Sequence, residues 1–537
     1  MKLKSNNILM GAAALSLLFG ATSCNDWLKE EQPGKTKLED FFSVGETCKQ
    51  VITGCYQPLA YEYNNTYFSE WFIGDIASDD ALKGGQNVSD GGDAYDIDNF
   101  KVNPGNVILR DYYRAKYMGI IRCNLALEQI EAYEVDETLS QEMKDRLMGE
   151  AYFLRGFYYF QLVRVFGGVP LVDFVVDSSD RWQQPRASQQ EVYAKIVEDF
   201  ENAEKMLWDK NDRKYTDEDL GRATRGAAQA MLCKVNLYQQ KYDEAYTWGK
   251  KWVDEQYNAG VYSLFGDYAQ NFNLAGENGV ESVFEIQYIA DPTSDYGEGF
   301  GFTRGTFGPI LTRPRASSMG GNSGWGFDHP TQNLYEEYEP GDVRRDLTIG
   351  MPAQEDLDDP AVTYLGSPYF NLKTSLYEAG TFPALDHATR GPLNYRLIRA
   401  SDVLLLYAEA ALESGKDMNG AKWALEQVRA RARAASPAGS LPAFPGYNGY
   451  ADNADGLRAA LRHERRVELA MEGHRWFDLV RWGIVKEVMD KTSGSYASRE
   501  SEEARAEMAV YNPSTNGLFP IPSEEITLNP MDQNPGY

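Results

Sequence analysis

Two segments that lie far apart in the chain share one plan, and this repetition constrains the fold more than any other feature. Residues 227–253 and 402–432 each read as a helix, a short polar turn and a second helix. Ala245 and Ala421 occupy matching positions, with small side chains where two helices must approach closely. Helical hairpins of this kind bury their apolar faces by stacking on one another. The repeat predicts a mainly α-helical body of tetratricopeptide type with a concave face.

The pattern is mostly helical up to about residue 260, and a long amphipathic helix is predicted over 149–170, where it stops at two glycines and a proline. The region from about 265 to 395 has a different character. The segment 280–288 (VESVFEIQY) is rich in β-branched and aromatic residues and predicts a strand. It is followed over 290–331 by a stretch rich in Gly, Pro and aromatic residues. Long loops in compact proteins are functional or disordered, and disordered segments are poor in aromatics, so function is favoured.

The N-terminus predicts export. Lys2 and Lys4 precede an apolar run over 8–19, and small residues lead directly to Cys24. This run is too short to span a bilayer and fits a signal peptide, here residues 1–23. A Cys directly after the small residues predicts a bacterial lipoprotein in which Cys24 is the lipidated N-terminus. The polar segment 24–40, with Pro-Gly in its middle, then reads as a tether.

Composition excludes some partners and favours others. The formal net charge of −27 makes the surface repel phosphate backbones, so nucleic acid is not an expected partner. Aromatic residues make up 13% of the chain, with 34 Tyr and 10 Trp. Because Tyr and Trp combine a flat apolar face with a polar group, this excess is typical of binding surfaces.

No motif for catalysis stands out in the sequence. Phosphate-binding, dinucleotide-binding, GxSxG and HExxH patterns are absent. Glycoside hydrolysis needs two carboxylates, and Glu281 and Glu285 would share one face of the predicted strand. The simpler interpretation is the solvated face of an edge strand. Acids at 90, 93, 96 and 98 only loosely resemble a calcium loop, so calcium stays a weak alternative to the absence of any cofactor.

Cysteine usage does not indicate a disulfide framework. Cys48 and Cys55 are seven residues apart, which is about 10.5 Å along a helix and too far for a disulfide. No CxxC or Cys/His cluster predicts zinc. These two, with Cys123 and Cys233, are expected to be small buried side chains.

The segment 464–483 (ERRVELAMEGHRWFDLVRWG) has the densest charge in the chain, yet its four acids balance its four arginines. We expect a structural helix with ion pairs three residues apart, a close neighbour against Gly473, and His474 as a hydrogen-bonded core histidine. The expected pairs are Arg465–Glu468, Glu472–Arg475 and Asp478–Arg481, and the expected apolar stripe is Val467, Ala470, Met471, His474 and Phe477.

This segment also carries a family resemblance. Together with RASDVLLLYAEAAL (399–412), the lipoprotein start SCNDWLKEEQPGK, the helix AYFLRGFYYFQLVRVFGGVPLV and the end LFPIPSEEITLNPMDQNPGY (518–537), it resembles the SusD/RagB family. The matches run in the expected order along nearly the whole chain, and the final QNPGY is specific. The Ala at position 21 departs from the usual Leu of the lipoprotein motif.

The resemblance implies both fold and function. It implies an outward-facing outer-membrane lipoprotein of Bacteroidota that acts as the lid of a SusC-like TonB-dependent transporter. Such proteins capture oligosaccharides or polysaccharides, or in the RagB branch oligopeptides, without cleaving them. The implied fold is a helical body of tetratricopeptide-like units with an irregular, loop-rich ligand region and minor β structure. The acids after Cys24 are similar to the surface-export signals of these lipoproteins.

We therefore expect an N-terminal SusD-like helical domain over 41–260 and a RagB/SusD C-terminal domain over 261–537, with the ligand region at about 265–395. Aromatic planes cover the C–H faces of sugars, so loop aromatics are the natural glycan-binding candidates. The candidates are Trp325, Tyr296, Phe300 and Arg304 in the long loop, with Trp71 and Tyr95 near the polar segment that follows residue 83. Each also has a structural interpretation, and for Trp71 this is helical burial. An oligopeptide-binding lid and a glycoside hydrolase remain the alternative functions.

Overall fold

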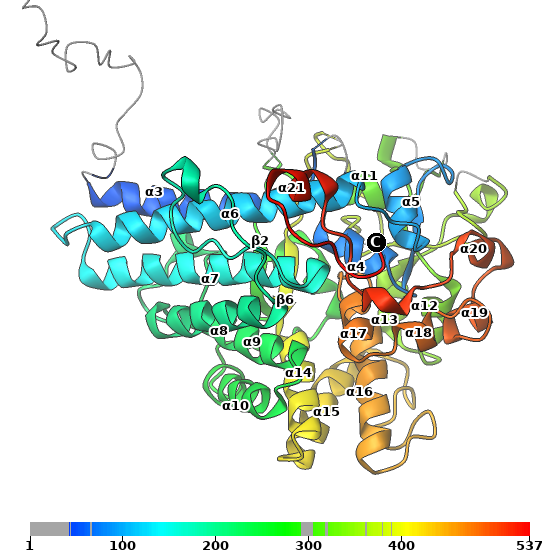
Figure 1. Ribbon diagram of the computed structural model, residues 1–537. Coiled ribbons are helices and arrows are strands. Elements are labelled where there is room, and N and C mark those ends of the chain that lie inside the picture. Colours follow the sequence, from blue (N-terminus) through cyan, green and yellow to red (C-terminus); the bar gives the residue numbers. More distant parts are fainter. Residues whose placement is uncertain are drawn as a thin grey trace, which may run out of the picture.

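Figure 1 shows the computed structural model of the chain. It describes residues 42, 44–64, 67–290, 304–316, 321–359, 362–378, 380–387 and 389–537. The predicted signal peptide, Cys24 and the tether lie outside the described residues. Among the residues that are described, no helix combines the length and apolar character needed to cross a membrane.

A stack of long helices forms one half of the molecule (Figure 1). Consecutive helices pack against each other from α6 to α10, and α10 packs on α14, which packs on α15. This arrangement confirms the mainly helical, tetratricopeptide-type body. The helices of the stack are α3 (Gly45–Tyr56), α6 (Val107–Ala132), α7 (Gln141–Phe166), α8 (Gln189–Met206), α9 (Arg225–Tyr238), α10 (Tyr242–Trp252), α14 (Ala400–Glu413) and α15 (Met418–Ala435).

The two predicted helical hairpins are present and touch each other. They are α9–α10 and α14–α15, and a shared apolar cluster joins Cys233 and Ala245 to the inner face of α14. Ala245 and Ala421 are both fully buried, as their small size predicts. At Gly249 an added Cβ would lie 3.2 Å from the Tyr407 Cα, so glycine allows α10 to approach α14 closely.

The predicted helix at 149–170 is the C-terminal part of α7, which runs through the centre of the core. Its residues from Phe153 to Phe166 are all buried, and a salt bridge of 2.7 Å joins Arg155 to Asp199 on α8. The helix begins at Ser140, whose side chain accepts the Met143 N–H, and ends before Gly167 at φ +70°. The four described cysteines are buried and free of disulfides, as predicted.

Short antiparallel strand pairs supply the minor β structure. The predicted strand appears as β2 (Ser282–Ile286), which pairs with β6 (Tyr395–Arg399). The other pairs are β1 (Ala81–Gly84) with β3 (Phe327–Pro330) and β4 (Ile349–Gly350) with β5 (Phe370–Asn371).

The expectation of a solvated carboxylate face on this strand is wrong. Glu281 and Glu285 are 0% and 2% exposed. Glu281 Oε1 lies 2.6 Å from Arg399 Nη1, and Glu285 Oε2 lies 3.1 Å from Arg396 Nε. Both acids are committed to buried ion pairs with the neighbouring strand, so neither is placed for glycoside hydrolysis.

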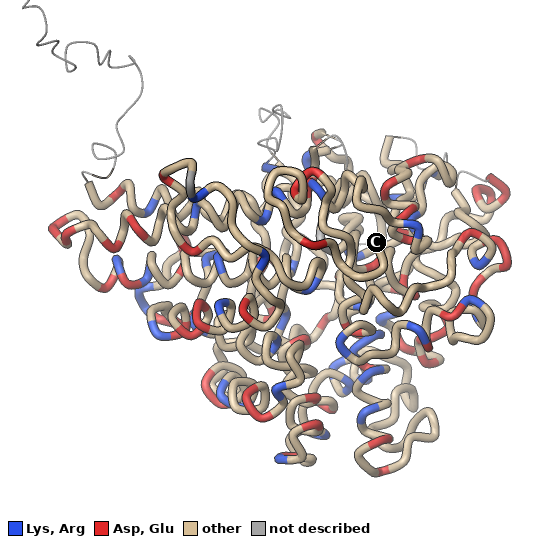
Figure 2. Tube along the Cα trace, viewed as in Figure 1, with Lys and Arg blue, Asp and Glu red and all other residues tan. Residues whose placement is uncertain are grey.

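Further helices, most of them shorter, and loops make up the rest of the molecule (Figure 1). They are α4 (Glu70–Ile76), α5 (Gly92–Asp98), α11 (Gly308–Thr312), α12 (Gln332–Glu337), α13 (Val343–Thr348), α16 (Ala454–Leu469), α17 (Arg475–Arg481), α18 (Val485–Val488), α19 (Ser495–Arg499), α20 (Glu502–Glu507) and α21 (Ser523–Leu528). Lys and Arg positions gather around α16 and α17, and acidic positions are frequent on the outer loops (Figure 2).

The charged segment 464–483 is not one helix, and this corrects the prediction. It forms α16 and α17, separated by a turn in which Met471 has φ +61° and Gly473 φ +72°. The expected close neighbour of Gly473 is present, because an added Cβ would lie 2.5 Å from the Trp71 Cα. The predicted stripe from Val467 to Phe477 is buried.

The break between the helices rearranges the predicted ion pairs. Asp478–Arg481 forms as predicted, with Oδ1 and Nε 2.8 Å apart. The predicted Arg465–Glu468 pair is wrong, since Arg465 contacts Asp402 and Asp478 at 2.6 Å each. These partners lie on other helices, so the ion pairs of Arg465 join different elements of the fold and do not run along one helix.

The third predicted pair is also replaced. Glu472 binds Arg399 at 2.8 Å and Lys373 at 2.7 Å, and Arg475 binds Asp79 at 2.7 Å. His474 is buried, as predicted, but its Nδ1 receives no hydrogen bond from any described residue.

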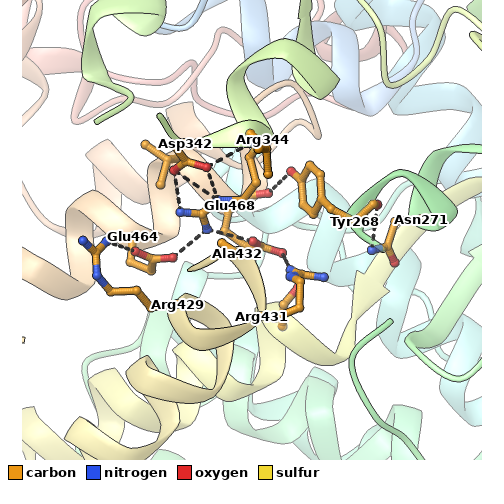
Figure 3. Close-up of polar contacts among 12 residues, drawn as sticks. Tyr268, Asn271, Asp342, Arg344, Arg429, Arg431, Ala432, Glu464 and Glu468 are labelled. Atoms are coloured by element: carbon orange, nitrogen blue, oxygen red, sulfur yellow. Dashed lines mark hydrogen bonds and ion pairs between the residues drawn. The ribbon is translucent and has the colours of Figure 1, made fainter. Parts of the chain in front are cut away.

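At the centre of this region, Glu468 lies within salt-bridge distance of three guanidinium groups. Figure 3 shows two of them, those of Arg344 and Arg431. The Glu468 oxygens are 2.5 Å from Arg431, 3.0 Å from Arg344 and 3.1 Å from Arg399. Burial alone would raise the pKa of Glu468, but the three arginines hold it well below its usual range. We call Glu468 with these arginines the buried ion network.

Candidate functional site

Four aromatic side chains meet where the described parts of the long loop, residues 304–316 and 321–331, pack on the segment around residues 63 and 67. Tyr63 and Tyr67 form an antiparallel β-bridge, and their ring centroids lie 5.2 Å apart. Phe307 lies 5.3 Å from Tyr63 and 5.1 Å from Tyr67, and Trp325 lies 5.7 Å from Tyr67. We call these four residues the aromatic cluster. They come from three segments of the chain that only the fold brings together.

Buried hydrogen bonds hold Phe307 in place. Glu62 accepts the Phe307 N–H at 2.9 Å and the Thr306 hydroxyl at 3.0 Å. Burial raises the pKa of Glu62, and these hydrogen bonds partly offset the rise. Thr306 also forms a two-way backbone bridge with Gly391. The ring is therefore fixed from both sides before α11 begins at Gly308.

Backbone contacts position Trp325 in the same way. Its N–H donates to the Ile310 carbonyl at 2.7 Å, and the N–H of Gly326 donates to the Arg313 carbonyl at 3.0 Å. At Gly324 an added Cβ would lie 2.5 Å from that carbonyl, so glycine is required for this approach.

The cluster has a rigid base and accessible rings. Phe307 is 2% exposed, whereas Tyr63, Tyr67 and Trp325 are each half-buried. Rings that keep part of a face in solvent can cover the C–H patches of a sugar, and their fixed positions limit the entropy lost on binding.

A polar segment adjoins the aromatic cluster and is linked to it by one arginine. Arg315 Nε donates to the Trp325 carbonyl at 2.6 Å, and its Nη2 donates to Asp90 Oδ2 at 2.9 Å. Asp90 Oδ2 also accepts the Gln86 N–H at 2.8 Å. Gln86, Asn87 and the residues up to 89 are exposed. This geometry places hydrogen-bonding groups next to flat apolar faces, as sugar recognition requires.

The predicted site residues do not all lie in one place in the structure. Trp325 belongs to the aromatic cluster. Tyr296 and Phe300 lie outside the described residues. Arg304 is exposed, and its carbonyl accepts the Ile289 N–H at 2.9 Å.

The two remaining candidates lie elsewhere. Trp71 is 2% exposed and packs on Phe72 with centroids 5.8 Å apart, which is the structural interpretation that the sequence left open. It lines a cavity of only ≈ 20 Å³, far smaller than a sugar. The Tyr95 hydroxyl accepts a hydrogen bond from Lys101 at 2.7 Å and donates to Glu507 on α20.

Tyr63, Tyr67 and Phe307 were missed as candidates. The segment 61–68 reads YEYNNTYF, with aromatic residues around an Asn-Asn turn, and this is the signal that could have identified two of them. Phe307 lies within the predicted aromatic loop, but nothing local distinguishes it from the other rings there.

The acids of the loose calcium-like segment have other partners. Asp98 accepts the Lys83 N–H at 2.8 Å, and burial raises its pKa to about 7. Asp93 accepts the Val107 N–H at 3.0 Å. Within the part of the chain that the structure describes, no group of three or more His, Cys, Asp or Glu is arranged to hold a metal ion.

Two family models match the chain. The model of the SusD family matches residues 383–537, and a model described as starch-binding associating with outer membrane matches residues 26–237. Neither description names an enzyme. SusD-like protein P25 of Formosa agariphila is 23% identical, with 96% of each chain covered. A SusD-like protein of Bacteroides ovatus is 22% identical, covering 90% of this chain and 83% of that protein.

Solved structures agree with these matches. A laminarin-binding SusD-like protein superposes with a TM-score of 0.73 at 26% identity, covering 92% of this chain and 99% of that one. A SusD homologue from Bacteroides thetaiotaomicron has a TM-score of 0.77 at 22% identity, covering 94% and 99%. The helical-repeat fold is thus that of SusD-like proteins, and the chain belongs to the SusD/RagB family.

Proposed function

We propose that this protein captures oligosaccharides or polysaccharides at the cell surface and binds them without cleavage. The observation that carries the proposal is the aromatic cluster, with accessible rings beside the polar segment that Arg315 links to Trp325. Membership of a family whose matched model is described as starch-binding supports it, as does the laminarin-binding relative. Ring stacking supplies affinity, and the polar groups orient the hydroxyls.

The cellular role that we propose follows from the family. Lipidation at Cys24 would anchor the protein to the outer membrane, facing outward. There it would act as the lid of a SusC-like TonB-dependent transporter and pass the captured glycan inward. Co-purification of such a transporter with the tagged protein from membranes, lost when Cys24→Ser prevents anchoring, tests this part.

Isothermal titration of the purified protein against a polysaccharide panel that includes laminarin and starch tests glycan capture. We expect binding without release of reducing sugar. Peptide binding with no response to glycans would support an oligopeptide-binding lid instead, and release of reducing sugar would contradict both and indicate a hydrolase.

Variants then test the site. Trp325→Ala and Tyr67→Ala should each weaken glycan binding at least about fivefold, because stacked rings contribute on the order of 1 kcal/mol or more each. Trp182→Ala is the matched control, since Trp182 is 72% exposed on a different segment. Unchanged affinity in both site variants would refute the aromatic cluster as the binding site.

A further inference from the structure

A second pocket lies at the junction of the helical body and the C-terminal segment. Residues of α7, α8, α9 and α17 line it together with the turn at 516–518, and no member of the aromatic cluster does. Its volume is ≈ 240 Å³, well above the roughly 10–15 Å³ that one water needs. The pocket therefore has room for an organic ligand.

Three exposed carboxamides form the rim of this pocket. They belong to Gln189 at the start of α8, Gln240 after α9 and Asn516 in the C-terminal segment. Gln240 has φ +57° and Asn516 φ +52°, both in the left-handed region that few residues other than glycine adopt. Backbone strain of this kind gathers at ligand sites, and here two strained residues bring amides to one opening.

Aromatic rings and a guanidinium form the inner surface. The lining includes the rings of Tyr193, Tyr238 and Phe477 and the guanidinium of Arg164. The Arg164 guanidinium lies 4.2 Å from the centroid of the Phe477 ring, which fixes its position by a cation–π contact. The Phe160 ring packs edge-on against Tyr238 at 5.0 Å and fixes that ring.

Two guanidinium groups line the pocket, those of Arg164 and Arg481, and carboxylates neutralise the second. Arg481, which also lines it, is held by both oxygens of Glu409 at 2.5 and 2.7 Å and by Asp478 at 2.8 Å. The rim carboxamides are neutral and can both donate and accept hydrogen bonds, as sugar hydroxyls require. An anion, in contrast, could use only the donors of these carboxamides.

We propose that this pocket binds a single uncharged pyranose unit and is a second carbohydrate site, separate from the aromatic cluster. It goes beyond the function proposed above because it shares no residue with that site and would add a second point of attachment to a long glycan. Two linked contacts strengthen binding of a chain even when each is weak.

Saturation-transfer NMR of the purified protein with methyl glucoside, galactoside and mannoside at about 10 mM tests the proposal, since single-sugar contacts fall in the millimolar range. We expect transfer from at least one glycoside. The double variant Gln240→Gly/Asn516→Gly should reduce that transfer at least about fivefold, because it removes two hydrogen-bonding amides. Glycine relaxes both left-handed positions, so folding should be retained.

Asn448→Gly is the matched control, since Asn448 is exposed at φ +51° outside the pocket, and it should leave the transfer unchanged. All of these variants are compared in a Tyr67→Ala background, so that the aromatic cluster contributes little to the transfer. Transfer that persists undiminished in the double variant, or that no glycoside produces, would overturn the proposal. Glycan titration with Tyr67→Ala tests the aromatic cluster independently, so the two failures are distinguishable.

Discussion

The buried ion network and the aromatic cluster differ in charge and in exposure to solvent. The network places Glu468 among three arginines in the interior, with every side chain nearly or fully buried. The aromatic cluster is neutral, has three partly exposed rings on a buried Phe307, and is held mainly by backbone hydrogen bonds. In this protein, dense charge therefore belongs to the scaffold, and a few neutral rings form the proposed ligand face.

The physical reason lies in the cost of burying charge. A buried ion pair must recover a large desolvation penalty, so it persists only where geometry is complete, and it then fixes the relative positions of the elements it joins. Rings on a surface carry no such requirement. A rigid charged interior can thus support a face whose rings are free to serve different ligands.

The largest expected effect comes from removing the centre of the network. Glu468→Ala should lower the free energy of unfolding by about 3–5 kcal/mol, because it leaves buried guanidinium groups without their shared carboxylate. Chemical denaturation measures this. Glu502→Ala, at an exposed position, should change it by less than about 0.5 kcal/mol. A loss below 1 kcal/mol for Glu468→Ala would show that the network is not a scaffold.

The next effect tests the turn between α16 and α17. Gly473→Ala should cost about 2–4 kcal/mol, since it combines a left-handed φ of +72° with a Cβ 2.5 Å from the Trp71 Cα. Gly483→Ala is the control: its φ is +70°, but nothing lies within 4 Å of the added Cβ. Equal costs in thermal unfolding would mean that backbone strain alone acts and the contact with α4 is unimportant.

The pKa values of two histidines in this region are shifted in opposite directions. Burial would lower the pKa of His463, but hydrogen bonds to Glu337 and Glu339 raise it to about 9. Burial lowers the pKa of His474 to about 3, with Lys234 adding to the effect. His463 is therefore charged and His474 neutral in the folded protein at pH 7.

The sign of each contribution follows from linkage. The raised pKa of His463 adds stability that is complete below the unfolded pKa of about 6.5 and is lost as pH rises toward 9. His463→Gln should cost about 2 kcal/mol at pH 6 and much less at pH 9.5. The lowered pKa of His474 acts oppositely, since the unfolded state gains its proton as pH falls below about 6.5. A pH-independent cost for His463→Gln in denaturation curves would contradict this assignment.

Much of the scaffold could be predicted from the sequence. The helical hairpins, the helix over 149–170 and the strand at 280–288 follow from periodicity and from residues that start and stop elements. The break after Leu469 could not, because the pattern of buried residues continues through the turn and a mid-helix glycine is tolerated. Glu281 looked solvent-exposed because its partner Arg399 is over a hundred positions away in the chain.

The site was only partly predictable. Trp325 was a candidate and belongs to the proposed site, yet the contact between Tyr67 and Phe307 forms only in the folded chain. Trp71 was a candidate with an alternative structural interpretation, and α4 places it in the core. Which aromatic rings stay at the surface depends on tertiary contacts that local composition does not encode.

The smallest effect on stability is expected beside the aromatic cluster, where an ion pair is compared with those of the buried ion network. Arg315 and Asp90 form a partly exposed ion pair, so Arg315→Ala should change the free energy of unfolding by no more than about 1 kcal/mol. Glycan affinity should nevertheless fall several-fold in calorimetry, because Arg315 joins the Asp90 carboxylate to the Trp325 carbonyl.

Arg345→Ala is the control for this last prediction, since Arg345 forms a similar partly exposed pair with Asp346, 2.8 Å away, outside the site. It should match Arg315→Ala in stability and leave glycan affinity unchanged. If both variants bind glycan as the wild type does, the polar segment takes no part in recognition, and the rings alone hold the ligand. If only Arg315→Ala binds less tightly, an ion pair that contributes little to folding sets the geometry of the proposed ligand face. The ion pairs of the interior, in contrast, stabilise the fold and take no part in binding.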